Sequence, residues 1–223
     1  MVLEEFIEEW NNESDTVRVH TSGSTGKPKE MLVEKERMAA SARITCSFLG
    51  LKRGDTSLLC MPLDYIAGKM MVVRSLVCGL KLIAVEPSGL PLRGFTSGGC
   101  PEISFAAMVP MQVYNSMQVD GEREILRGIR HLIIGGGAVD GELAAALRDF
   151  PNAVWSTYGM TETLSHIALR RINGEEASDW YTPFSGVSVK VDNQSRIIID
   201  APHVCKDVLT TNDIGEMAPD GRC

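Results

Sequence analysis

The most informative stretch of this chain is HTSGSTGKPK at residues 20–29, which follows a short apolar run at residues 16–19. Its two glycines let the backbone approach an anion closely, because no Cβ intervenes. Backbone N–H groups, hydroxyls and Lys ammonium groups are common partners of phosphate oxygens, so we interpret the stretch as a polyphosphate clamp. A flexible Gly/Ser turn is the alternative. A Walker A loop is excluded, because it needs Ser or Thr after its Lys, whereas Pro28 follows Lys27.

Four segments together resemble signature elements of the adenylate-forming superfamily, which comprises acyl-CoA synthetases, luciferases and the adenylation domains of peptide synthetases. They are TSGSTGKPK at residues 21–29, GGGA at 135–138, YGMTET at 158–163 and TNDIGE at 211–216. In the last segment Asn212 stands where the superfamily has Gly, so this element is a weaker match. The four lie in the superfamily's order and span nearly the whole chain.

Composition narrows the classes of protein. The 223 residues suffice for one large domain, or for a domain with a subdomain. A net charge of −7, with no basic cluster beyond Lys27 and Lys29, argues against a nucleic-acid partner. No apolar run reaches the length of a membrane span, and the acidic first residues lack the basic start of a signal peptide, so we expect a cytoplasmic protein. The six cysteines lack the spacing of a zinc site and are interpreted as reduced thiols.

Apolar segments that resemble strands alternate with helical ones, which predicts an α/β fold with a mainly parallel sheet flanked by helices. Strands are expected at residues 56–61, 80–85, 103–109, 131–134 and 153–157, and helices at 34–49, 67–78 and 141–149, with a further helix opening at Pro110. Gly79 is expected to end one helix and Asp140 to cap another.

The pattern of apolar segments changes after Asn173. Two apolar runs at residues 187–191 and 196–199 flank DNQS, which predicts a hairpin. We therefore expect an ATP- and acyl-binding α/β core at residues 1–173 and a smaller β-rich subdomain at 174–223. The superfamily continues past its TGDIG element into a hinge and a small C-terminal domain, so we expect the chain to be a truncated N-terminal domain whose own missing domain is a partner.

The resemblance also implies a reaction. Superfamily members use ATP to convert a carboxylic acid to an acyl-adenylate, and a thiol, usually of coenzyme A, then displaces AMP. It thus implies an acid–thiol ligase with ATP, Mg²⁺ and coenzyme A, in which Thr161 donates to the α-phosphate and Glu162 binds Mg²⁺. By the same resemblance the phosphate-binding residues would be Thr21, Ser22, Gly23, Ser24, Thr25, Gly26, Lys27 and Lys29. The adenine- and ribose-binding residues would be Gly135, Gly136, Gly137, Tyr158, Gly159 and Asp213.

Each element beyond the loop also has a structural interpretation. Glu162 could be a carboxylate at a helix N-terminus, and Asp213 a turn residue. Tyr158 could be a half-buried core aromatic. Residues 135–137 could be a simple strand-to-helix turn. Their joint occurrence in the superfamily's order favours the functional interpretation.

The chain departs from the superfamily pattern at two points. Tyr65 stands where many members have a His, and Asp64 where they have an aromatic residue. The catalytic lysine of the C-terminal domain has no counterpart, so we expect this chain to bind ATP or an acyl-adenylate but to turn over poorly. The sequence leaves the oligomeric state open, and a homo-oligomer is one possibility.

The run at residues 62–74 looks most like short o-succinylbenzoate–CoA ligases of menaquinone biosynthesis. That acid has two carboxylates, and the one that does not react needs a cation or donors in the acyl pocket. Arg74 is our candidate, with a solvated helix-surface Arg as the alternative. Tyr65, Ser165 and His166 would line the same pocket, although His166 could equally be a core or surface residue. Competing functions are a ligase or adenylation domain for another aryl or small acid, and a non-catalytic nucleotide-binding module.

Overall fold

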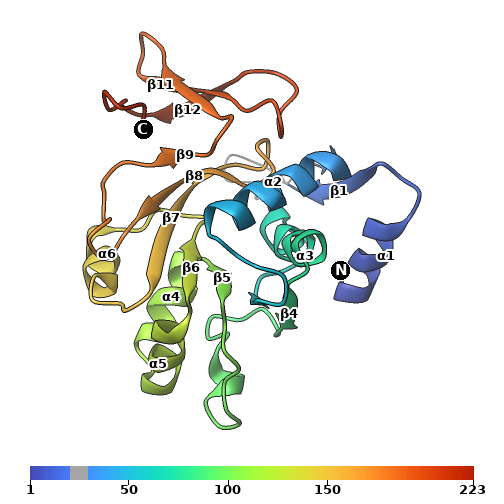
Figure 1. Cartoon of the computed structure of the whole chain (residues 1–223), viewed down its shortest axis with the longest axis vertical. Helices are drawn as coiled ribbons and strands as arrows, with labels where there is room; N and C mark the ends of the chain where they lie inside the picture. Colours follow the sequence, from blue (N-terminus) through green and yellow to red (C-terminus); the bar gives the residue numbers. More distant parts are fainter. Residues whose placement is uncertain (21–29) are drawn as a thin grey trace.

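A computed structural model describes residues 1–20 and 30–223, so the predicted polyphosphate clamp at 21–29 lies outside the described residues. A seven-stranded sheet in the order β4-β3-β5-β6-β7-β8-β9 forms the centre of the molecule (Figure 1). Its strands are β3 (Thr56–Leu59), β4 (Lys81–Ala84), β5 (Phe105–Met108), β6 (His131–Ile134), β7 (Ala153–Gly159), β8 (His166–Arg171) and β9 (Thr182–Pro183).

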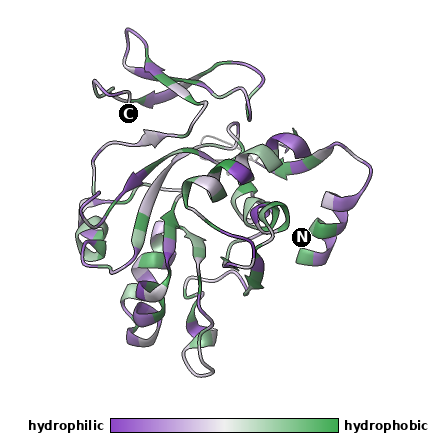
Figure 2. Cartoon of the chain, in the orientation of Figure 1, coloured by the Kyte–Doolittle hydropathy of each residue, from purple (hydrophilic) through white to green (hydrophobic). Residues whose placement is uncertain are grey.

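The first five strands in this sheet are parallel, and β8 and β9 are antiparallel additions at one edge. The strand β5 is buried along its whole length and β6 along all but its first residue, which explains their continuous apolar sequences (Figure 2). The predicted α/β fold with a mainly parallel sheet is confirmed. The antiparallel pairing of β8 and β9 was not predicted.

Helices flank the sheet, and those from α3 onward lie in the connections between its parallel strands. They are α1 (Leu3–Asn11), α2 (Lys35–Phe48), α3 (Ile66–Cys78), α4 (Pro110–Met117), α5 (Asp120–Gly128) and α6 (Gly141–Leu147), with a 3₁₀ turn at Arg93–Phe95. The helices α2 and α3 pack on each other, as do α4 and α5. Across residues 1–20 and 30–223, no helix has both the length and the apolar character needed to cross a bilayer.

Three predicted helix boundaries are confirmed. Gly79 follows α3 with φ 68°, a conformation that its missing Cβ allows. Asp140 precedes α6, and its Oδ1 accepts from the backbone N–H of Leu143 at 2.8 Å. Pro110 is the first residue of α4. The helix α6 ends at Leu147, two residues before the expected end.

Two smaller antiparallel sheets complete the fold. The strands β1 (Thr16–His20) and β2 (Glu30–Glu34) pair so that His20 lies opposite Glu30. The strands β10 (Ser188–Val191), β11 (Arg196–Asp200) and β12 (Leu209–Ile214) form a separate sheet, whose first two strands make the predicted hairpin. This sheet begins later than the expected subdomain boundary at residue 174, because β9 still pairs with β8 of the large sheet.

Candidate functional site

A cavity of about 200 Å³ lies at the carboxyl ends of β3, β5, β6 and β7. Ligands of open α/β sheets bind at this edge, where the loops that follow the parallel strands converge. The cavity is lined by His20, Met61, Tyr65, Ile66, Ala67, Arg74, Ala107, Met108, Val109, Ile133, Gly135, Gly136, Thr157, Gly159, Met160, Thr161, Ser165 and His166. The structure therefore brings to one cavity the four predicted acyl-pocket residues and part of the predicted nucleotide site.

Arg74 is the most unusual residue of this cavity. It lies in α3 with only 1% of its surface exposed, so the alternative of a solvated surface Arg is wrong. Its Nη2 donates to Ser165 Oγ at 2.7 Å, and Nη1 lies 4.0 Å from the sulfur of Met71. Its Nε has no partner among the described residues. Burial lowers the pKa of Arg74 to about 10, which leaves it charged at neutral pH.

No carboxylate in the described part of the chain forms an ion pair with Arg74; the groups acting on its charge are the thiols of Cys46 and Cys78. A buried charge without a partner costs several kcal/mol, so this position is unfavourable unless something compensates it. An anionic ligand in the cavity would supply that compensation.

Ser165 connects Arg74 to a chain of hydrogen bonds. Its Oγ lies 3.2 Å from His166 Nδ1, and His166 Nε2 lies 3.1 Å from Thr45 Oγ1 in α2. Thr45 Oγ1 in turn donates to the backbone carbonyl of Ser41 at 3.1 Å. Burial, with a smaller contribution from the charge of Arg74, holds the pKa of His166 well below 6.5, so the ring is neutral. His166 is thus a buried residue that also lines the cavity.

The turn between β7 and β8 presents Thr161 and Glu162. It is held by Thr163, whose Oγ1 accepts from the backbone N–H of Met160 at 2.9 Å and lies 2.7 Å from the carbonyl of Ser165. Leu164 adopts φ 61°, an uncommon value for a non-glycine residue. Glu162 is exposed on this turn and begins no helix, so the alternative of a helix N-terminal carboxylate is wrong.

Gly159 stands where this turn leaves β7. A Cβ there would lie 2.3 Å from the carbonyl oxygen of Ser165 and 2.5 Å from His166 Cα, so any side chain would collide with the backbone. Gly135, at the end of β6, has a similar constraint, because its Cβ would lie 2.4 Å from Thr157 Oγ1. Gly159 is therefore required by the backbone that packs against it, whereas a side chain at position 135 would require the hydroxyl of Thr157 to move.

The remaining predicted nucleotide residues lie beside the cavity rather than on its wall. Tyr158 is half-buried in β7, and its hydroxyl donates to Asp213 Oδ2 at 2.9 Å. Burial and this contact raise the pKa of Tyr158, so it remains a donor. Asp213 belongs to the strand β12, so the turn interpretation of Asp213 is wrong. Gly137 lies in the connection from β6 to α6, against Pro110, which also fits a simple turn.

The sequence of residues 5–217 matches the model of the AMP-binding enzyme family. The chain belongs to this family. A similar solved structure is an acyl-CoA synthetase (AMP-forming)/AMP-acid ligase II-like protein from Dyadobacter fermentans, with 34% identity and a TM-score of 0.89 over 98% of this chain and 61% of that one. The o-succinylbenzoate coenzyme A synthetase of Bacillus subtilis, solved with ATP and magnesium ion, has 21% identity and a TM-score of 0.74 over 92% of this chain and 48% of that one, and shows the shared fold.

Curated relatives of this AMP-binding chain include the 2-succinylbenzoate–CoA ligase of Bacillus mycoides, which is 29% identical over 172 residues. That match covers 74% of this chain and 34% of the relative, so the chain spans about a third of the length of the curated relatives that it matches. The resemblance to adenylate-forming enzymes that the four motifs indicated is confirmed.

Sequence analysis missed several residues of the candidate site. His20 lines the cavity just before the predicted clamp, and Thr45 contacts His166 from a distant helix. Thr163 lies inside the YGMTET signature but had no predicted role. The only signal for Thr45 was that it is a polar residue on the inner face of α2, and the sequence did not indicate that its partner is His166.

Magnesium would have few ligands from the described residues, which contain no group of three or more His, Cys, Asp or Glu side chains placed to hold a metal. An exposed single carboxylate such as Glu162 nevertheless fits this ion, because Mg²⁺ is commonly bound by one or two carboxylates together with substrate phosphates and water.

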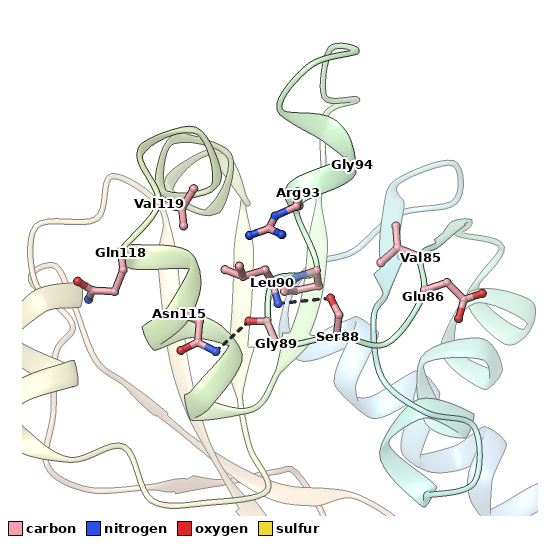
Figure 3. Close-up of a pocket in the computed structure, with 11 residues that line it drawn as sticks. Val85, Glu86, Ser88, Gly89, Leu90, Arg93, Gly94, Asn115, Gln118 and Val119 are labelled. Carbon is pink, nitrogen blue, oxygen red and sulfur yellow. Dashed lines mark hydrogen bonds between the residues drawn. The ribbon is translucent and has the colours of Figure 1, made fainter.

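A second hollow, of about 930 Å³, lies between the segment that follows β4 and the end of α4 (Figure 3). In it the amide of Asn115 donates to the carbonyl of Gly89 at 3.2 Å, and Arg93 projects from the facing segment. None of the predicted site residues lines it. The smaller cavity at the strand ends is therefore the candidate site.

Proposed function

We propose that this chain is the ATP- and acid-binding part of an acyl-CoA ligase that activates o-succinylbenzoate. The observation that carries the proposal is the buried guanidinium of Arg74, which faces the cavity without an acidic partner among the described residues. An acid with a second carboxylate would supply the missing charge. The similarity to 2-succinylbenzoate–CoA ligases supports this choice of acid.

In the proposed reaction the reacting carboxylate of the acid attacks the α-phosphorus of ATP, and the bond to the pyrophosphate leaving group breaks. The acyl-adenylate then transfers its acyl group to the thiol of coenzyme A with release of AMP and the thiol proton. Both steps develop negative charge around phosphorus or the acyl oxygen, so fixed donors near that point lower the barrier.

Thr161, on the cavity wall, is proposed to donate to the α-phosphate. Glu162, exposed beside it, would hold Mg²⁺, which would neutralise phosphate charge when bound. Gly135 and Gly136 would form a wall for the adenine, and the hydrogen-bonded pair of Tyr158 and Asp213 would receive the adenine and the ribose hydroxyls. The stretch 21–29 would hold the leaving phosphates.

Arg74 would receive the carboxylate that does not react. Nε is buried, and Nη2 donates one proton to Ser165, which leaves Nη1 and the second N–H of Nη2 as donors with no oxygen partner in the residues that the structure describes. A carboxylate can accept from two N–H groups of one guanidinium, and such charge-assisted pairs are among the stronger hydrogen bonds of proteins. This geometry favours a dicarboxylic acid over an aryl acid with a single carboxylate.

The test is calorimetric binding of non-hydrolysable acyl-adenylate analogues that differ only in the acyl group: o-succinylbenzoyl, benzoyl and acetyl. We expect the first to bind tightest. Equal binding of all three would leave an adenylate-binding chain with a different acid, and absence of binding by any of them would contradict the proposal. Acid-dependent AMP formation by this chain alone is expected to be slow.

A further inference from the structure

The buried chain of hydrogen bonds behind Arg74 has a single consistent direction. Arg74 can only donate, so Ser165 Oγ accepts from it at 2.7 Å. The Thr45 hydroxyl has one proton, so when it donates to the carbonyl of Ser41 at 3.1 Å its oxygen can only accept from His166. His166 lies between these two hydroxyls, 3.2 Å and 3.1 Å away, with one proton on its neutral ring.

Only one arrangement of the protons lets all the hydrogen bonds of this chain form at once. His166 must donate from Nε2 to Thr45, and Nδ1 must accept the hydroxyl proton of Ser165. With the proton on Nδ1 instead, the ring would donate to Ser165, and its Nε2 lone pair would either face the Thr45 oxygen or take the Thr45 proton away from the carbonyl of Ser41. The second arrangement loses a buried hydrogen bond, and a buried group without a partner is unfavourable.

We propose that Thr45 is a positioning residue that fixes His166 as the Nε2–H tautomer and thereby orients the Ser165 hydroxyl to accept from Arg74. Thr45 is fully buried in α2 and does not line the cavity, so it acts only through this chain. The ring of His166 is further held by Phe184, whose centroid is 5.5 Å away in an edge-on arrangement. Thr45 would then influence which acid is preferred without touching it; this consequence rests on the proposed function.

The experiment compares wild type, Thr45→Val and Thr45→Ser. The tautomer of His166 is read from two-bond ¹H–¹⁵N correlations of ¹⁵N-histidine-labelled chain, with His166→Gln to assign the signal among the four histidines. We expect Nε2–H in wild type and Thr45→Ser, and a change to Nδ1–H in Thr45→Val, because Val has the shape of Thr without an acceptor. Nδ1–H in wild type, or an unchanged tautomer in Thr45→Val, would overturn the proposal.

Binding provides the second readout. In Thr45→Val the affinity for the o-succinylbenzoyl adenylate analogue should fall about fivefold to tenfold, and the affinity for the benzoyl analogue less than about twofold. Thr45→Ser, which keeps the hydroxyl, should bind both analogues as wild type does. Equal weakening of both analogues would overturn the selective role. If Thr45→Val does not fold, the wild-type tautomer and the Thr45→Ser chain still decide. If wild type binds both analogues equally, the proposed function is wrong, and the tautomer alone then supports or overturns the role of Thr45.

Discussion

The proposed acyl side and the proposed nucleotide side of the candidate site are built differently. On the proposed acyl side Arg74 and His166 are buried, at 1% and 6% exposure; Ser165 connects the two, and Thr45 contacts the other nitrogen of His166. On the nucleotide side Glu162 and Asp213 are exposed, and one hydrogen bond, from Tyr158, connects the large sheet to Asp213 of the small one. A preorganised buried network can discriminate between acids, because a ligand that does not match it leaves buried polar groups unpaired. Exposed groups that meet the nucleotide, which all the acids share, are expected to affect every acyl-adenylate alike.

The largest predicted effect is a loss of stability at Gly159, the residue that the two sides share. In Gly159→Ala the new Cβ would collide with the backbone of Ser165 and His166, and neither can move without disturbing the network. We expect the free energy of unfolding to fall by about 3 kcal/mol or more, measured by urea denaturation. The matched control is Gly141→Ala, where no atom lies within 4 Å and a change below about 1 kcal/mol is expected. Similar small changes in both variants would contradict this packing.

The second prediction concerns the pH dependence of stability that buried His166 on the acyl side should cause. The pKa of His166 is held well below 6.5, so as the pH falls below 6.5 the unfolded chain binds a proton there that the folded chain does not. The contribution of neutral His166 to the free energy of unfolding should be fully present above pH 6.5 and should decrease toward pH 4.5. Carboxylates whose pKa is lowered from 4.5 or 3.8, such as Glu34 and Asp55, also stabilise the folded chain, but that stability is lost only as the pH falls to these ordinary values and below, at the acid end of this range.

The measurement is urea denaturation at several pH values between 6.5 and 4.5, compared with His166→Gln. The variant should lose stability less steeply, with the remaining slope due to His131 and His203, whose pKa values burial also lowers. The same slope in both chains would show that His166 does not resist protonation.

The smallest effect is expected on the nucleotide side. Tyr158→Phe removes one partly exposed hydrogen bond, so every acyl-adenylate analogue should bind about threefold to tenfold more weakly, whatever its acyl group. Tyr181→Phe is the control, because it loses a hydroxyl contact to Ser156 rather than to Asp213 and should leave affinity nearly unchanged. A loss confined to the o-succinylbenzoyl analogue would contradict the division into two sides.

The sequence was sufficient for the features that depend on local pattern. Alternating apolar segments predicted the parallel sheet, and Gly79, Pro110 and Asp140 marked helix ends because each has a local backbone or capping reason. Pairing of β8 with β9, and of β1 with β2, was not predicted, since an isolated strand pattern does not specify its partner. The burial of Arg74 was also beyond local pattern: in a mostly apolar helix a lone Arg is expected to face solvent, and only the packing of α3 against α2 and the contact of Arg74 with Ser165 decide otherwise.

The most direct test of the account is a cycle between Arg74 and the second carboxylate of the acid. Calorimetry would compare the o-succinylbenzoyl adenylate analogue with its counterpart carrying an amide in place of the free carboxylate, in wild type, Arg74→Met and Arg93→Met. Met has a similar shape and removes an unpaired buried charge, so Arg74→Met should fold. We predict that replacing the carboxylate by the amide weakens binding to wild type and to Arg93→Met by about 2 kcal/mol, roughly thirtyfold in affinity. Binding to Arg74→Met should be almost unchanged by the same replacement. An equal penalty in all three chains would contradict the assignment of Arg74 to the second carboxylate.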